Sequence, residues 1–181
     1  MPFARKPSKS YDEAALYEYA VAALARKMRT VAELKRLLRQ KIVPEQIALV
    51  DAVMDRLKEH NYLNDSRYAA AYSCLRKENQ KFGSRRVISD LKVKGVPSDV
   101  IASTVPAIYE NVDDVEQARK YLQRKRARKP AGQREAARIF RMLMRAGFSG
   151  STTVKVLKTW KVDDETLAAL ESESAGIESP E

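Results

Sequence analysis

LKRLLRQKIVP, at residues 34–44, returns 53 residues later as VISDLKVKGVP, at residues 87–97. A looser copy, IFRMLMRAGFS, follows at residues 139–149, a further 52 residues along the chain. Apolar residues coincide at positions 34/87/139, 38/91/143 and 43/96/148. A fixed period of this length is the signature of tandem structural repeats, so the chain is predicted to contain three of them.

Each repeat is predicted to fold as three helices, because apolar residues recur around each copy at intervals of three and four. In the first repeat, TVAE at residues 30–33 is a capping-box pattern that begins the helix carrying Leu34 and Leu38. Pro44 suits the first turn of the next helix, and Gly95 suits a helix end in the second repeat. Pro106 is predicted to kink or end the last helix of the second repeat.

The fold class that follows is all-α: an elongated array of three tandem three-helix repeats with nine core helices. We expect a disordered N-terminal tail at 1–10, repeats at 11–64, 65–112 and 113–170, and an acidic, disordered C-terminal tail at 171–181. Each repeat has few apolar residues, so its neighbours are expected to lend it buried area.

The short link between the first and second repeats is predicted to hold them closely together. Asn64 or Asp65 is expected to cap the helix that follows. Four side chains are predicted to be buried at this junction, namely Tyr62, Leu63, Tyr68 and Leu91. Tyr72 and Leu75 are expected to continue the inner stripe of that helix.

Composition excludes several classes of protein. The single Cys and single His cannot supply the four ligands of a structural zinc site. The isolated glycines form no phosphate-binding loop, so we expect neither a cofactor nor an enzyme. No apolar run approaches the roughly 20 residues of a membrane span. The N-terminus lacks the apolar segment of a signal peptide, so a cytoplasmic protein is expected. No long heptad seam is present, which favours a monomer.

Charge is unevenly distributed. The chain has 34 Lys and Arg against 24 Asp and Glu, a net charge of +10. Between Arg119 and Lys161 there are 14 basic residues and one acid, Glu135, whereas residues 162–181 hold seven acids and no base. The basic block predicts a surface that binds a polyanion. The acidic segment is expected to be able to screen the charge of that surface.

Specific reading of DNA by a helix-turn-helix is disfavoured, because the helix predicted at residues 98–110 has no Lys or Arg to meet a phosphate-lined groove. Non-specific contact with a nucleic-acid backbone, or contact with an acidic protein surface, fits the charges better; the alternative is that they form the solvated faces of amphipathic helices. The candidate contact residues are Arg67, Arg85, Arg86, Lys92, Lys94, Lys120, Arg124, Lys125, Arg126, Arg128, Lys129, Arg138, Arg141 and Arg145.

Three stretches resemble signatures of the RecX family. Residues 61–68, NYLNDSRY, are similar to the family's Gly-Tyr-Leu-Asp-Asp-x-Arg-Phe, and residues 81–87, KFGSRRV, match a second signature. Residues 141–148, RMLMRAGF, resemble the signature of the third repeat. The similarity runs from about residue 15 to residue 161 and is most specific between 62 and 96. Asn61 departs from the pattern, as does Ile42, because both stand where the family has Gly.

The resemblance implies a modular, curved molecule without catalytic activity. It implies a protein that lies in the groove of the RecA recombinase filament on single-stranded DNA and represses RecA's ATPase, strand exchange and co-protease activity. Recombination, DNA repair and the SOS response would be modulated as a result. Two alternatives remain open at this point: a stand-alone, non-specific nucleic-acid-binding helical module, and a repeat adaptor for an acidic protein.

Overall fold

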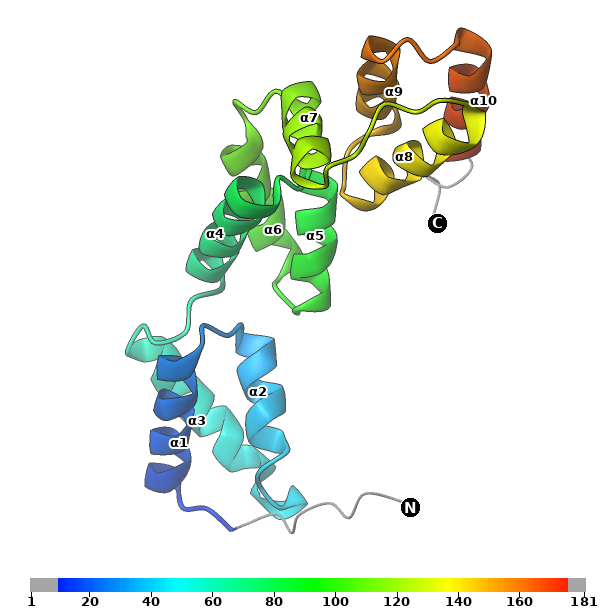
Figure 1. Ribbon diagram of the computed structural model, residues 1–181. Helices are drawn as coiled ribbons and strands as arrows, with labels where there is room; N and C mark the ends of the chain where they lie inside the picture. The colour runs from blue at the N-terminus through cyan, green and yellow to red at the C-terminus, as the bar shows by residue number, and fades with distance from the viewer. Residues whose placement is uncertain (1–9, 176–181) are drawn as a thin grey trace, which may run out of the picture. The chain divides into compact units, whose positions relative to one another are not determined.

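The computed structural model describes residues 10–175, which are helical apart from turns and connecting segments, with no strand among them (Figure 1). The α-helices are α1 (Glu13–Arg26), α2 (Val31–Arg39), α3 (Ile47–Glu59), α4 (Asp65–Leu75), α5 (Ser84–Val93), α6 (Ser98–Tyr109), α7 (Asp114–Arg124), α8 (Gln133–Arg145), α9 (Gly150–Thr159) and α10 (Asp164–Ala175). A 3-10 turn, η1 (Pro44–Gln46), precedes α3, and a π-helical turn, η2 (Arg76–Gln80), follows α4. The disorder expected at the two ends of the chain falls mostly on residues 1–9 and 176–181, which lie outside the described residues.

The described residues form two compact units. Unit 1 comprises the residues up to Ala69 together with Leu91–Ile101, and unit 2 comprises Ala70–Asp90 and the residues from Ala102 onward. In unit 1, α1, α2 and α3 pack against one another. In unit 2, α9 packs against α7, α8 and α10. The division between the units runs through the second of the three sequence repeats.

The repeated sequence pattern supplies the core of the molecule. The side chains at positions 34/87/139 and 38/91/143 are all fully buried, namely Leu34, Val87, Ile139, Leu38, Leu91 and Leu143. Each lies on the inner face of the second helix of its repeat. Full burial of such a side chain stabilises the fold by about 1.5–3 kcal/mol, so each of the six contributes to the packing of its repeat. The prediction of an all-α repeat array is confirmed.

Helix α10 was not predicted from the sequence. It begins as α1, α4 and α7 begin, with an Asp or Asn side chain that accepts a hydrogen bond from a backbone N–H of the first turn. These caps are Asp12, Asn64, Asp113 and Asp163, with N–O distances between 2.7 and 2.9 Å. The recurrence of this cap at intervals of about 50 residues makes α10 equivalent in position to the first helix of a repeat. Of the two expected capping residues, Asn64 is the one that caps α4.

Two expectations for the C-terminal part of the chain are therefore wrong. The nine predicted helices become ten α-helices in the described range, and the disordered tail predicted from residue 171 would start inside a helix that continues to Ala175. Leu167 and Leu170 of α10 are buried in the core of unit 2. The acidic segment 163–181 is thus more than a removable screen, because deleting it would strip apolar side chains from that core.

Six helical segments end in residues with a left-handed backbone, at φ between 52° and 92°, namely Asn61, Lys81, Gly95, Arg126, Gly147 and Lys161. After Asn61, the Tyr62 N–H donates to the Leu57 carbonyl at 2.9 Å, the bond of a Schellman motif. Asn tolerates this conformation better than most residues, which explains how Asn61 replaces the family's Gly. Ile42 is not among these residues, so its position requires no Gly.

The repeats are joined by a recurring contact between a helix start and a glycine turn. In unit 1, the Thr30 hydroxyl at the start of α2 donates to the Lys94 carbonyl at 2.7 Å, and a Cβ on Gly95 would lie 2.5 Å from that of Ala32. In unit 2, the Gly83 N–H before α5 donates to the Ala146 carbonyl at 2.9 Å. The second helix of one repeat therefore begins against the turn that ends the second helix of the next repeat.

Individual side chains at the first junction show where the predictions hold. Leu63, Tyr68 and Leu91 are buried as predicted, whereas Tyr62 is 50% exposed. The left-handed turn at Asn61 directs the chain so that Leu63 enters the core in place of Tyr62. Leu75 is also exposed, at 52%, because the helical path changes to the π-helical turn η2 directly after it. Pro106 lies inside α6, which continues to Tyr109 instead of ending.

Leu63→Ala is expected to lower the free energy of unfolding by about 2–5 kcal/mol. The side chain is 6% exposed and belongs to the apolar core of unit 1. Urea unfolding followed by far-UV circular dichroism measures the change. A loss below about 0.5 kcal/mol would show that Leu63 contributes no more than a surface residue.

Candidate nucleic-acid interface

Helix α8 carries arginines on one face and the core on the other. Arg134, Arg138, Arg141 and Arg145 are exposed and spaced by four, three and four residues, so they form one stripe on a helix of 3.6 residues per turn. The opposite face buries Ala136, Ile139, Phe140 and Leu143. Arg134 lies outside the fourteen candidates; its spacing from Arg138 is the signal that identifies it.

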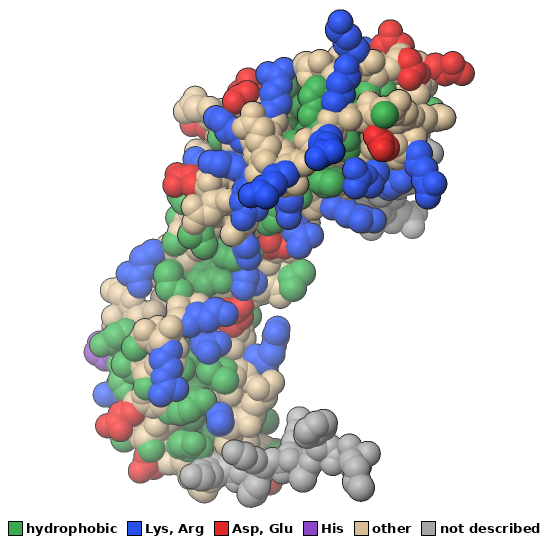
Figure 2. Space-filling model, viewed as in Figure 1, with side chains coloured by type: hydrophobic (Ala, Val, Ile, Leu, Met, Phe, Trp, Pro, Cys, Tyr) green, Lys and Arg blue, Asp and Glu red, His purple; other side chains and the backbone are tan. Residues whose placement is uncertain are grey.

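The segment between α7 and α8 extends this basic surface. Arg124 ends α7, Arg126 adopts the left-handed conformation at φ 52°, and the Lys125 ammonium lies 5.8 Å from the centre of the Tyr121 ring. Arg128 and Lys129 follow and are exposed. Lys and Arg side chains gather over α7, this segment and α8 (Figure 2). We call the exposed bases Lys120, Arg124, Lys125, Arg126, Arg128, Lys129, Arg134, Arg138, Arg141 and Arg145 the basic surface of unit 2.

Acidic residues do little to neutralise this surface. Glu135, the one acid between Arg119 and Lys161, accepts a hydrogen bond from the Ala131 N–H at 2.8 Å and so supports the start of α8. Glu116 lies 3.7 Å from the Lys120 ammonium. Such exposed pairs are weak and exchange readily with other anions, so the surface keeps most of its charge.

Packing brings the start of α5 to the end of α8. The backbone of Arg86 lies directly against Gly147, where an added Cβ would clash with the Arg86 nitrogen. Arg86 and Arg85 therefore lie beside the C-terminal turn of the helix that carries Arg145. The Arg86 guanidinium is paired with Asp90 at 3.0 Å, so part of its charge is already satisfied within the protein.

The remaining candidates, Arg67, Lys92 and Lys94, belong to unit 1. Arg67 and Lys92 are exposed. Lys94 is half-buried, and its ammonium lies 2.9 Å from Glu33. Although burial lowers the pKa of Lys94, hydrogen bonds to Glu33 and Tyr68 raise it above its ordinary value. Lys94 therefore stabilises the first junction and is a poor candidate for binding an external anion.

The described residues offer no alternative centre of metal chemistry. Within residues 10–175, no three His, Cys, Asp or Glu side chains are grouped to hold a metal ion. None of the helices in this range is long and apolar enough to cross a bilayer.

Comparison with known proteins identifies the family. Residues 17–57 match the family model of the first three-helix domain of RecX, and residues 64–105 match the second. The Regulatory protein RecX of Leptothrix cholodnii is 33% identical over 141 residues, which is 77% of this chain and 85% of that protein. The chain belongs to the RecX family. The RecX of Pseudomonas fluorescens is 32% identical over 80% of this chain and 91% of its own length.

Solved RecX structures share the fold. The crystal structure of RecX from Lactobacillus salivarius superimposes with a TM-score of 0.64 at 19% identity, covering 82% of this chain and 96% of that one. A second structure, of regulatory protein RecX, gives a TM-score of 0.69 at 22% identity, covering 80% of this chain and 72% of that one. The relatives found by sequence are named regulatory proteins. Membership of the RecX family therefore supports a regulatory role.

Proposed function

We propose that this RecX-family protein binds the RecA filament on single-stranded DNA and inhibits its ATPase, strand exchange and co-protease activity. In this role it modulates recombination, DNA repair and the SOS response, acts in the cytoplasm as a monomer, and performs no catalysis itself. Membership of the RecX family is the observation that carries this proposal, because charge and shape alone name no partner.

The basic surface of unit 2 supports the part of the proposal that concerns DNA. Its ten exposed bases come from α7, α8 and the segment between them, where a polyanion meets little opposing charge. Contacts of this kind neutralise phosphates without reading sequence. The helix α6 has no Lys or Arg, which favours backbone contact over insertion of a recognition helix.

The test is a titration of RecA's DNA-dependent ATPase with this protein. Inhibition that saturates at a fixed ratio of protein to RecA supports the proposal. Tight binding to naked single-stranded DNA without inhibition beyond displacement of RecA would support a stand-alone nucleic-acid-binding module instead. The salt dependence of binding gives the number of phosphates neutralised, at about 0.7 log units of affinity per tenfold salt for each contact.

A further inference from the structure

Three surface grooves in the described residues prove to be one feature repeated three times. Each is lined on one side by the segment that follows the first helix of a repeat, and on the other by the segment that follows its third helix. In repeat 1 these segments contribute Met28 and Tyr62, in repeat 2 Lys81 and Val112, and in repeat 3 Gly132 and Val162. The groove volumes are about 550, 250 and 150 Å³, so the first repeat has much the largest.

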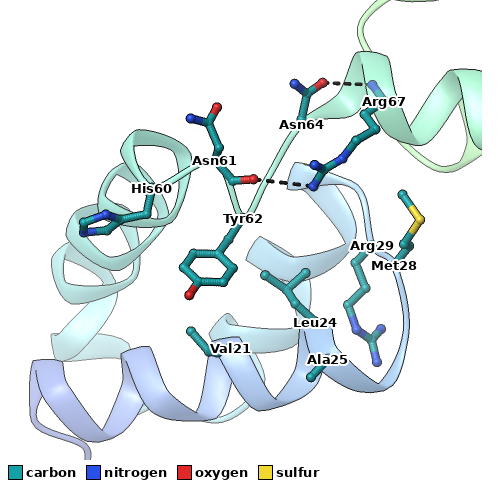
Figure 3. A pocket seen from close by; sticks show the side chains of 10 residues that line it. All are labelled: Val21, Leu24, Ala25, Met28, Arg29, His60, Asn61, Tyr62, Asn64 and Arg67. Atoms are coloured by element: carbon teal, nitrogen blue, oxygen red, sulfur yellow. Dashed lines mark hydrogen bonds between the residues drawn. The ribbon is translucent and has the colours of Figure 1, made fainter.

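The groove of repeat 1 has an apolar floor with exposed apolar walls. Val21, Leu24 and Ala25 of α1 form the floor, with Tyr62 on one side and Met28 on the other (Figure 3). Tyr62 is 50% and Met28 48% exposed, and both are among the five large apolar side chains left exposed in the described residues. Two of the five therefore face one hollow, where a partner's apolar side chain would cover both.

The rim of this groove is cationic. Arg29 and Arg67 line it, and none of the described residues around it is an Asp or Glu. Among the described residues, the buried Nε of Arg29 has no hydrogen-bond partner, and the Arg67 guanidinium makes one long contact, of 3.5 Å to the Asn61 carbonyl (Figure 3). An anionic group that enters the groove would meet the guanidinium groups of Arg29 and Arg67. No carboxylate among the described lining residues neutralises them.

The same groove in repeat 2 is mixed in charge, because Lys77, Lys81 and Lys120 line it together with three acids. Glu116 occupies the position that Arg67 occupies in repeat 1, three residues after the cap of the following helix, and Glu78 and Asp113 also line the groove. The Gln117 amide reaches across and donates to the Lys77 carbonyl at 2.8 Å, which ties the two sides together. The apolar floor and the acid-free rim are thus properties of repeat 1 and not consequences of the repeat architecture.

We propose that the repeat 1 groove binds an acidic segment of a partner protein, which inserts one large apolar side chain between Tyr62 and Met28. Tyr, Met and Arg are the residue types enriched in the cores of protein interfaces, where Lys is depleted, and the groove contains no Lys. A stacking site for single-stranded nucleic acid would combine several aromatic rings with a basic track, whereas this floor is aliphatic. The inference goes beyond the proposed function, and its test uses no recombinase.

The five methionines of the chain allow the groove to be observed directly. In the full-length protein labelled with 13C at the methionine methyls, Met28 reports on the groove, and Met54, which is 2% exposed, reports on the folded core of the same unit. The probe is a short peptide rich in Glu and Ser with one central Phe. A control peptide has Ala in place of the central Phe. A thymidine oligonucleotide is tested as a third ligand. We expect the Phe peptide to shift the Met28 signal saturably, at least about fivefold more tightly than the Ala peptide.

Two variants and one control separate this site from general charge attraction. Arg67→Glu, which copies the residue of repeat 2, and Tyr62→Ala are each expected to weaken the Phe peptide about tenfold, with the Met54 signal unchanged. Arg124→Glu, an equal charge change on unit 2, should leave binding within about twofold. Equal binding of both peptides, an equal loss in Arg124→Glu, or tighter binding of the oligonucleotide at Met28 would overturn the proposal. RecA inhibition, measured separately, would stand or fall independently.

Discussion

Reversing Arg124, Lys125 and Arg128 to Glu is expected to weaken binding to a RecA–single-stranded DNA filament by about 100-fold at moderate salt. The three side chains are exposed, and the one contact to the core that the change removes is the 5.8 Å approach of the Lys125 ammonium to the Tyr121 ring. The net charge falls from +10 to +4, because each reversal removes two charges. Three attractions to phosphate are replaced by three repulsions, while the apolar core is unaltered. Helicity and thermal unfolding should therefore remain as in the wild type.

Binding is measured by fluorescence anisotropy of the filament, and inhibition by RecA's ATPase rate, at one fixed salt concentration because screening alone can mimic the loss. The matched control reverses Arg26, Arg36 and Arg39, which are exposed on unit 1, and changes the net charge equally. An equal loss in the control would attribute the effect to total charge. Undiminished inhibition by the triple variant would place the contact on the first two repeats.

The repeat array was predictable because its determinants are local and periodic. Leu34 and Leu38 lie one helical turn apart, and the same spacing returns at Val87 and Leu91. Burial at these positions follows from the amphipathic pattern, whatever the neighbouring elements do. Gly95 marked the end of a helix for a similarly local reason, since its φ of 76° suits the residue that has no side chain.

The last helix and the orientation of Tyr62 were not predictable on these grounds. The segment that forms α10 is acidic and rich in Ser, so its composition is typical of a tail, and two apolar positions, Leu167 and Leu170, are all that fix it to the core. Tyr62 follows a turn whose left-handed residue is Asn61, and the direction of the chain after such a turn depends on tertiary packing. The buried position therefore moves one residue along, to Leu63.

The excess of basic residues in the candidate surface was predictable from the sequence, but which of these residues are free to bind a partner was not. The excess of bases between Arg119 and Lys161 is evident in the sequence, and helical spacing places Arg138, Arg141 and Arg145 on one face. Which bases are already paired depends on residues distant in sequence. Lys94 pairs with Glu33, 61 positions away, and no local pattern announces that contact.

Gly147→Ala is expected to destabilise unit 2 by about 3 kcal/mol or more, because two penalties coincide at this turn. The backbone of Gly147 has φ 92°, a conformation that residues with a Cβ rarely adopt. The added methyl group would also clash with the Arg86 backbone, which the turn contacts directly. Rotation of a flexible side chain cannot relieve a clash with a main-chain nitrogen, so α5 and α8 would have to separate.

Trp160 provides the measurement, since it is the single tryptophan of the chain and packs against the core of unit 2. Its fluorescence during urea unfolding reports on that unit alone. The matched control is Gly132→Ala, at a position with extended backbone and nothing within 4 Å of a new Cβ. Its cost should stay below about 1 kcal/mol, the value of a helix cap. Equal losses in the two variants would mean that removing a glycine, and not the close approach of two repeats, sets the penalty. A large difference would establish that the repeats require glycine where the end of one second helix meets the start of another.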